Sequence, residues 1–218
     1  GENNEALLDA IREGAPDLIA ITGDLFDAQT DRAALEPLLR ALLTAAPVFY
    51  VTGNHEYWSH EFGSILQMFR SYGIIILNGS YNTVEINGQR LNICGITDPD
   101  AAIYTDTANT QTQLEALKHA HDNGLYTILL AHRPEKIETY LPYGFDLVLS
   151  GHAHGGQWRL PGLINGLYAP HQGFFPKYAG GEYRFDNTIM IVSRGLARES
   201  TRVPRIFNRP ELVIIDLT

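Results

Sequence analysis

The chain has 218 residues, 44% of them hydrophobic and 19% charged, with 25 acidic against 16 basic side chains and a net charge of −9. A chain of this size hides enough surface to fold without disulfides, so we expect residues 1–218 to form a single domain. The negative charge repels polyanions, which excludes nucleic acid as a partner.

No apolar run approaches the ~20 residues that span a bilayer. We therefore expect a soluble domain, which is either cytoplasmic or held at a membrane by a segment that precedes residue 1. The single cysteine, Cys94, lies in the apolar run LNICGI and is expected to be a small core residue.

The predicted elements alternate between helices and strands along most of the chain. A helical apolar period runs up to Gly14, and Asn87-Gly88 between two alternating runs indicates a β-hairpin. In chain order we expect helix 3–13, strand 18–22, helix 31–44, strand 48–52, helix 59–71, strand 74–77, strands 81–86 and 90–96, helix 110–122, strand 126–131, helix 134–140, strand 146–149, and strands 188–192 and 212–217.

Strands that alternate with helices favour a parallel sheet core, and hairpins favour antiparallel strands at its flanks. Several buried runs end directly at Gly, His or Asp. Ligands of such sheets gather beyond the carboxyl ends of the strands, so the candidate chemistry converges on one edge.

Four strand ends carry polar side chains suited to a metal. They are Gly-Asp-Leu-Phe-Asp at 23–27, Gly-Asn-His-Glu at 53–56, Ala-His-Arg-Pro at 131–134 and Gly-His-Ala-His-Gly-Gly at 151–156. Carboxylate, amide oxygen and imidazole suit Mn, Fe and Zn. Alone, the first two stretches are typical of turns and a single histidine is typical of a hydrogen-bonded side chain. Their joint occurrence at strand ends favours a metal site.

The motifs GD-x-x-D, GNHE, a strand-end His and GHxH, in this order within residues 18–156, resemble the calcineurin-like metallophosphoesterase superfamily. The continuation GHAHGGQWRLPG and the closing RPELVIIDL look like its bacterial, membrane-associated branch. The resemblance implies a four-layer α/β/β/α sandwich of two mixed sheets. It also implies a metal-dependent hydrolase that cleaves a phosphomonoester or phosphodiester by attack of a metal-bound hydroxide.

The resemblance also implies a role for each site residue. Two divalent ions (Mn, Fe or Zn) occupy the complete family site, and His55 is the acid that protonates the leaving group or steadies the phosphate. The implied metal ligands are Asp24, bridging both ions; Asn54, His132 and His152, on the second ion; and His154, on the first ion.

The family opens with a strand and an Asp-x-His motif, and neither is found before Asp24. We therefore expect the sheet to lack its first strand. The first ion keeps only Asp24 and His154, so one ion or none is expected. The alternative to an enzyme is a non-catalytic metal-binding or scaffold module that retains the fold.

Other residues allow two interpretations each. Asp27 orients a ligand from behind or caps the following helix, and Arg133 holds a substrate phosphate or lies on the surface. Tyr57 and Trp58 stack on a substrate or pack in the core. Residues 160–178, apolar and glycine-rich, form a lip that touches lipid or a buried loop. The expected partner is a phosphate-ester small molecule or a lipid-linked phosphate, with peripheral membrane contact; the sequence does not define the oligomeric state.

Overall fold

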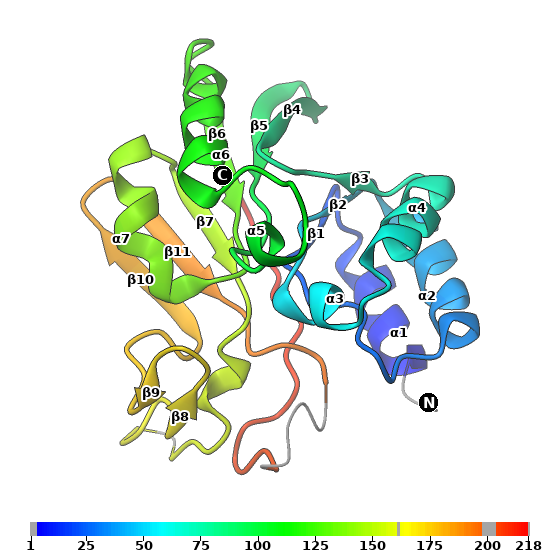
Figure 1. Cartoon of the computed structure of the whole chain (residues 1–218), viewed down its shortest axis with the longest axis vertical. Coiled ribbons are helices and arrows are strands. Elements are labelled where there is room, and N and C mark those ends of the chain that lie inside the picture. The colour runs from blue at the N-terminus through cyan, green and yellow to red at the C-terminus, as the bar shows by residue number, and fades with distance from the viewer. Residues whose placement is uncertain (1–3, 161, 198–203, 218) are drawn as a thin grey trace.

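The computed structural model describes residues 4–160, 162–197 and 204–217. It contains two main sheets that lie side by side, each with helices on its outer side (Figure 1).

The smaller sheet has three parallel strands in the order β1-β2-β3. Helices pack on its outer face, and a short helix, α3, follows β2 directly. The elements of this half are α1 (Asn4–Gly14), β1 (Ile19–Ile21), α2 (Arg32–Ala45), β2 (Val48–Tyr50), α3 (Asn54–Trp58), α4 (Phe62–Tyr72) and β3 (Ile75–Ile76).

The larger sheet has six strands in the order β10-β11-β7-β6-β5-β4, antiparallel at both flanks and parallel between them. Its strands are β4 (Ser80–Ile86), β5 (Gln89–Gly95), β6 (Tyr126–Leu130), β7 (Leu147–Ser150), β10 (Gly181–Phe185) and β11 (Thr188–Val192). The helices and the small hairpin of this half are α5 (Ala101–Tyr104), α6 (Thr110–Leu117), η1 (Lys118–His121), η2 (Pro134–Lys136), α7 (Ile137–Tyr140), η3 (Leu141–Tyr143), η4 (His154–Gly156), β8 (Tyr168–Ala169) and β9 (Gly173–Phe174).

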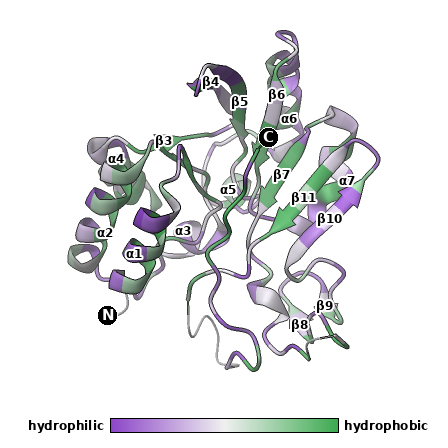
Figure 2. Ribbon diagram, turned by 180° about the vertical axis from the view of Figure 1, so that it is seen from behind, coloured by the Kyte–Doolittle hydropathy of each residue, from purple (hydrophilic) through white to green (hydrophobic). Residues whose placement is uncertain are grey.

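Three buried clusters separate four layers. In β2, Val48 and Tyr50 pack with α1, α2 and α4, whereas Phe49 faces the other way into a cluster shared with the larger sheet. This alternation follows from the two-residue period of a strand. The third cluster joins the outer face of the larger sheet to α6 and α7, and it contains Cys94. In Figure 2, β7 and β11 are green, which marks the hydrophobic residues that these strands contribute to the clusters. The α/β/β/α sandwich is confirmed.

Cys94 is fully buried, and burial raises the pKa of its thiol to about 12, as a core residue requires. The predicted hairpin is also confirmed, with Ile86 paired to Gln89 and both turn residues, Asn87 and Gly88, at positive φ (51° and 79°).

Two expectations about strands are corrected. The smaller sheet is entirely parallel, not mixed. Residues 212–217 form no strand: Ile215 packs in the cluster between the sheets, but no described strand pairs with this segment. Its apolar run reflects this packing, although no described strand is hydrogen-bonded to it. Among the described residues, β1 pairs only with β2.

Some elements differ from the predicted ranges or were not predicted. Residues 54–58 form α3, and the helix expected from residue 59 begins at Phe62. The strand β10 and the hairpin β8–β9 were not predicted. None of the helices in the described part of the chain is long and apolar enough to cross a bilayer.

Candidate metal centre

The predicted ligands come from loops that follow strands of both sheets. Asp24 and Asn54 follow β1 and β2, and His132 and His152 follow β6 and β7. The carboxyl ends of these parallel strands lie on the same side of the molecule, where the two sheets meet (Figure 1). The fold therefore brings together side chains that are more than 100 residues apart in sequence.

The imidazole Nε2 atom of His132 is the centre of this group. It lies 3.1 Å from Asp24 Oδ2, 3.2 Å from Asn54 Oδ1 and 3.1 Å from His152 Nδ1. The other ring nitrogen, Nδ1, lies 2.6 Å from the carbonyl oxygen of Thr22 and donates to it. A neutral His132 therefore directs its Nε2 lone pair toward the oxygens of Asp24 and Asn54, an arrangement that a cation or an added proton makes favourable.

The electrostatics of the group agree with this geometry. Burial disfavours the charged form of His132, but the neighbouring Asp24 carboxylate outweighs it and raises the pKa of His132 to about 9. Burial also acts against the Asp24 carboxylate, yet His132 and His55 hold its pKa well below the ordinary value. Burial and the nearby positive charge lower the pKa of His152, which is neutral. A divalent ion bound by Asp24, Asn54, His132 and His152 would satisfy the atoms that the added proton on His132 satisfies.

Two glycines allow the first two loops to approach each other. A Cβ atom on Gly53 would overlap the side chain and the backbone nitrogen of Asp24. A Cβ atom on Gly23, whose φ is 94°, would lie 2.5 Å from the Gly53 nitrogen and 2.7 Å from Nδ1 of His132. The close contact of the two loops thus depends on hydrogen at both Cα positions.

Glu56 holds the same two loops together by hydrogen bonds. The sequence analysis did not predict this role. Its fully buried carboxylate accepts hydrogen bonds from the backbone nitrogens of Asp24 (3.0 Å), Phe26 (3.0 Å) and Gly53 (2.8 Å). Burial and the charge of Asp24 raise the pKa of Glu56. The signal in the sequence is the last residue of Gly-Asn-His-Glu, a charged side chain three positions after a glycine N-cap.

His55 and His154 lie outside this donor group. The backbone nitrogen of His55 donates to Asp24 Oδ1 (3.0 Å), and its half-buried ring packs on Trp58 with centroids 5.1 Å apart. The ring of His154 lies 3.4 Å, nitrogen to nitrogen, from the side chain of Gln157. Burial lowers the pKa of His154 to about 4, with Asp24 opposing, so the ring is neutral and able to act as a ligand.

Asp27 and Arg133 have other partners. Asp27 Oδ1 accepts from the backbone of Gln29 (2.9 Å) and the hydroxyl of Thr30 (2.7 Å), whereas Asp31 caps α2. Arg133 is buried and is not a surface residue. Its partners are Asp98 Oδ2 (2.5 Å) and Oδ1 (2.8 Å), Asp100 Oδ1 (3.1 Å) and His171 Nδ1 (2.8 Å).

Tyr57 packs in the core, with its hydroxyl 2.9 Å from Thr52 Oγ1. Trp58 is 44% exposed and donates through Nε1 to Asp100 (2.9 Å). The two aromatic neighbours of the second loop thus differ: one supports the loop and the other covers its outside.

His171 is a second residue that sequence analysis missed. Its Nδ1 atom lies 2.9 Å from His152 Nε2, on the side of that ring opposite His132. Glu135, His152 and His171 are close enough to form a second donor group. The guanidinium of Arg133 touches it at 2.8 Å, and this positive charge disfavours a second cation there. No local pattern marked His171, because its contact depends on the β8–β9 turn.

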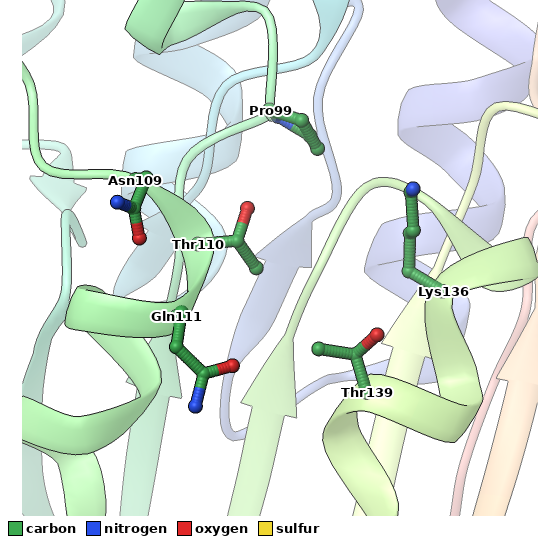
Figure 3. Close-up of a pocket in the computed structure, with 6 residues that line it drawn as sticks. All are labelled: Pro99, Asn109, Thr110, Gln111, Lys136 and Thr139. Atoms are coloured by element: carbon green, nitrogen blue, oxygen red, sulfur yellow. The ribbon is translucent and has the colours of Figure 1, made fainter.

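A separate pocket of about 280 Å³ opens between the start of α6 and the η2–α7 turn. Figure 3 shows Thr110 and Gln111 facing Lys136 and Thr139 across it. The predicted ligands do not line this pocket, so we place the candidate chemistry at the His132 group.

An α/β sandwich that gathers carboxylate, amide and imidazole donors at its strand ends has the architecture expected of a metal-dependent hydrolase. The chain belongs to the calcineurin-like phosphoesterases: the model of that family matches residues 2–156. The resemblance seen in the motifs is thereby confirmed.

Similar proteins agree with this family. The uncharacterized metallophosphoesterase YkuE of Bacillus subtilis is 28% identical over 99% of this chain and 73% of its own length. An uncharacterized metallophosphoesterase of Aquifex aeolicus is 32% identical (93% and 73%), and phosphodiesterase YaeI of Escherichia coli is 29% identical (94% and 72%).

Solved structures share the fold at low identity. A 5′-nucleotidase precursor from Thermus thermophilus superposes with a TM-score of 0.56 at 16% identity, covering 87% of this chain and 42% of that one. The sulfate thiohydrolase SoxB superposes with a TM-score of 0.53 at 18% identity, covering 88% and 36%. The chain thus spans less than half of either solved structure, and the likeness shows the fold alone.

Proposed function

We propose that this chain is a metal-dependent hydrolase of a phosphomonoester or phosphodiester, acting at the group around His132. The observation that carries the proposal is the approach of three potential ligand atoms, from Asp24, Asn54 and His152, to His132 Nε2 within 3.2 Å. Family membership and a relative named as a phosphodiesterase support the reaction class.

Asp24, Asn54, His132 and His152 would hold one ion, and Asp24 with His154 would contribute to a second. Nitrogen and oxygen donors of this kind fit Mn, Fe or Zn. Divalent ions bound there supply charge to the phosphoryl oxygens and lower the pKa of water. Catalytic sites commonly use at least three protein ligands per ion. We therefore expect one tightly held ion and a weaker second one.

The protein's own groups would orient the metal ligands and protonate the leaving group. The Thr22 carbonyl oxygen fixes His132 with Nδ1 protonated, which leaves Nε2 as the ligand atom. Glu56 holds the loops of Asp24 and Asn54 together. We propose that His55 protonates the leaving group, since its backbone is tied to Asp24 while its ring is outside the donor group. Arg133 would support the site through His171, which contacts His152, whereas the partners of Asp27 are Gln29 and Thr30 in its own loop.

The test compares the protein with His132→Ala and with His119→Ala, an exposed histidine on η1. Metal content after dialysis against manganese, and hydrolysis of a soluble aryl phosphodiester, are measured for each. We expect His132→Ala to lose the ion and the turnover while His119→Ala retains both. Equal metal content in all three proteins would overturn the assignment of the centre.

A non-catalytic metal-binding module is the second candidate, favoured by the position of His154 outside the donor group. It predicts tight metal binding without hydrolysis, even when a strand ending in Asp-x-His is joined before residue 1. Turnover that appears in this longer protein and falls by roughly 10²-fold in its His55→Ala variant would support the enzyme.

A further inference from the structure

A group of large apolar side chains is exposed at the end of the molecule that carries the metal centre. We call it the apolar rim. Several members are mostly exposed: Leu163 at 81%, Phe174 at 72% and Phe207 at 70%. The apolar rim consists of Trp158, Leu163, Phe174, Phe175, Ile206 and Phe207. Exposed apolar groups of this extent mark interaction surfaces.

The segments of the apolar rim are held together by backbone contacts. Trp158 forms a bridge with Ile206, and the Trp158 carbonyl oxygen accepts from the Leu167 nitrogen at 2.8 Å. The Leu167 carbonyl oxygen accepts from the Phe175 nitrogen, also at 2.8 Å. Figure 1 shows β8 and β9 at the end of the molecule where the strands of the larger sheet terminate. The apolar rim is therefore one fixed surface.

The charge of these segments is opposite to that of the whole chain. Residues 147–181 and 204–210 contain no Asp or Glu, although the chain carries 25 of them and a net charge of −9. The same segments contain the four cations Arg159, Lys177, Arg205 and Arg209, each within two residues of an apolar-rim side chain. Lys177 and Arg209 are exposed, Lys177 with Glu138 at 4.0 Å, whereas Arg159 and Arg205 are half-buried. Exposed apolar side chains with cations beside them suit an anionic lipid surface.

The apolar rim is also connected to the metal centre. His171, in the turn between β8 and β9, contacts His152 at 2.9 Å and Arg133 at 2.8 Å. A surface bound to the rim would therefore meet the molecule beside the metal centre. A phosphate ester at the level of lipid headgroups would then lie near the group that we propose to cleave it.

We propose that the apolar rim docks on an anionic phospholipid bilayer and that the phosphate ester of the substrate is carried by a lipid. The choice of substrate rests on the proposed function. A second copy of the chain fits the rim less well, because it would bring the exposed cations Lys177 and Arg209 of two copies together.

The experiment is sedimentation with vesicles of phosphatidylcholine and phosphatidylglycerol in equal parts, and with vesicles of phosphatidylcholine alone. We expect binding to the mixed vesicles and at least roughly tenfold weaker binding to the neutral ones. Phe174→Asp/Phe175→Asp should bind the mixed vesicles roughly 100-fold more weakly. Leu163→Asp provides a second rim variant. Ile103→Asp is the matched control, since Ile103 is 74% exposed on α5, and it should bind as the parent does.

Parent protein that does not sediment, or rim variants that sediment as it does, would overturn the proposal. The proposal would also be overturned if light scattering showed that the parent protein is a dimer and that the rim variants are monomers. Circular dichroism checks that each variant is folded. Hydrolysis of a soluble aryl phosphodiester separates the two proposals, because rim variants should retain the parent's rate. If the parent protein binds vesicles but does not hydrolyse the phosphodiester, the proposed function is contradicted and the proposed docking surface is still supported.

Discussion

His171 links two residues whose orientation matters at the metal centre. Its Nδ1 atom faces His152 Nε2 at 2.9 Å and receives a hydrogen bond from Arg133 at 2.8 Å. An acceptor at this position favours the His152 tautomer with hydrogen on Nε2, which leaves Nδ1 free to bind an ion beside His132. Arg133 is held by Asp98, so it keeps His171 in place.

We therefore predict that His171→Phe weakens metal binding by roughly 10–100-fold, the effect typical of groups that orient a ligand. His171→Asn should retain most of the affinity, because its side-chain oxygen can accept the same hydrogen bonds. Calorimetric titration of metal-free protein with manganese gives the affinity, and ¹⁵N shifts of His152 report its tautomer. A Phe variant with the parent's affinity and tautomer would contradict this role.

Gly53 provides a steric test of the centre. We predict that Gly53→Ala weakens metal binding at least roughly tenfold and costs about 1–3 kcal/mol of stability, because its Cβ atom would overlap Asp24. Gly63→Ala is the control: Gly63 lies exposed in α4, a Cβ atom there would meet no atom within 4 Å, and alanine should stabilise by about 0.5–1 kcal/mol. Urea unfolding and metal titration measure both effects; equal behaviour of the two variants would contradict the steric argument.

The sequence predicted that Asp24, Asn54, His132 and His152 gather, because each follows a buried run directly. It also predicted His154 among them, and the ring of His154 lies outside the donor group. It did not predict Glu56 and His171 as their supports. Glu56 acts through three backbone nitrogens that meet only when the β1 and β2 loops are adjacent. His171 reaches His152 across a loop without helical or strand periodicity. Such contacts are set by the tertiary fold.

At the scale of elements, α2 has a well-defined start. Asp31 precedes it with extended backbone and accepts a hydrogen bond from the Ala33 nitrogen at 2.9 Å. We predict that Asp31→Ala lowers the free energy of unfolding by about 0.5–2 kcal/mol through loss of this N-cap. Asp106→Ala, an exposed aspartate outside the helices, should change it by less than about 0.5 kcal/mol. A urea series in which both variants unfold together would contradict the cap.

The elements that could be predicted are those whose ends are marked by turn or cap residues in the sequence. The hairpin at Asn87-Gly88 and the helix ending at Gly14 depend on turn and cap residues, and the structure contains both. The predicted strand 212–217 was wrong because an apolar run indicates burial, whereas a strand also needs a hydrogen-bonded partner strand. The fold class was predictable because strand and helix runs alternate over most of the chain.

At the scale of the whole molecule, the metal centre joins the two sheets. Asp24 and Asn54 belong to the loops of the smaller sheet, and His132 and His152 to those of the larger one. The pairing of Asp24 with His132 at 3.1 Å connects the same halves. An ion at this centre would add bonds across the junction, so occupancy should stabilise the complete chain, which we propose to be one domain.

We predict that manganese at about 100 times its dissociation constant stabilises the folded chain by roughly 2.7 kcal/mol, since the unfolded chain does not assemble the donors. For a chain of this size the midpoint of thermal unfolding should rise by roughly 5–10 °C, and a chelator should reverse the rise. His132→Ala should abolish the metal-dependent shift, because it removes the atom at the centre of the donor group; His119→Ala should keep it. Scanning calorimetry with and without metal measures the shift, and one transition should move as a unit, since the ligands come from both sheets. Two transitions, only one of them metal-dependent, would contradict both the single domain and the joining role of the centre.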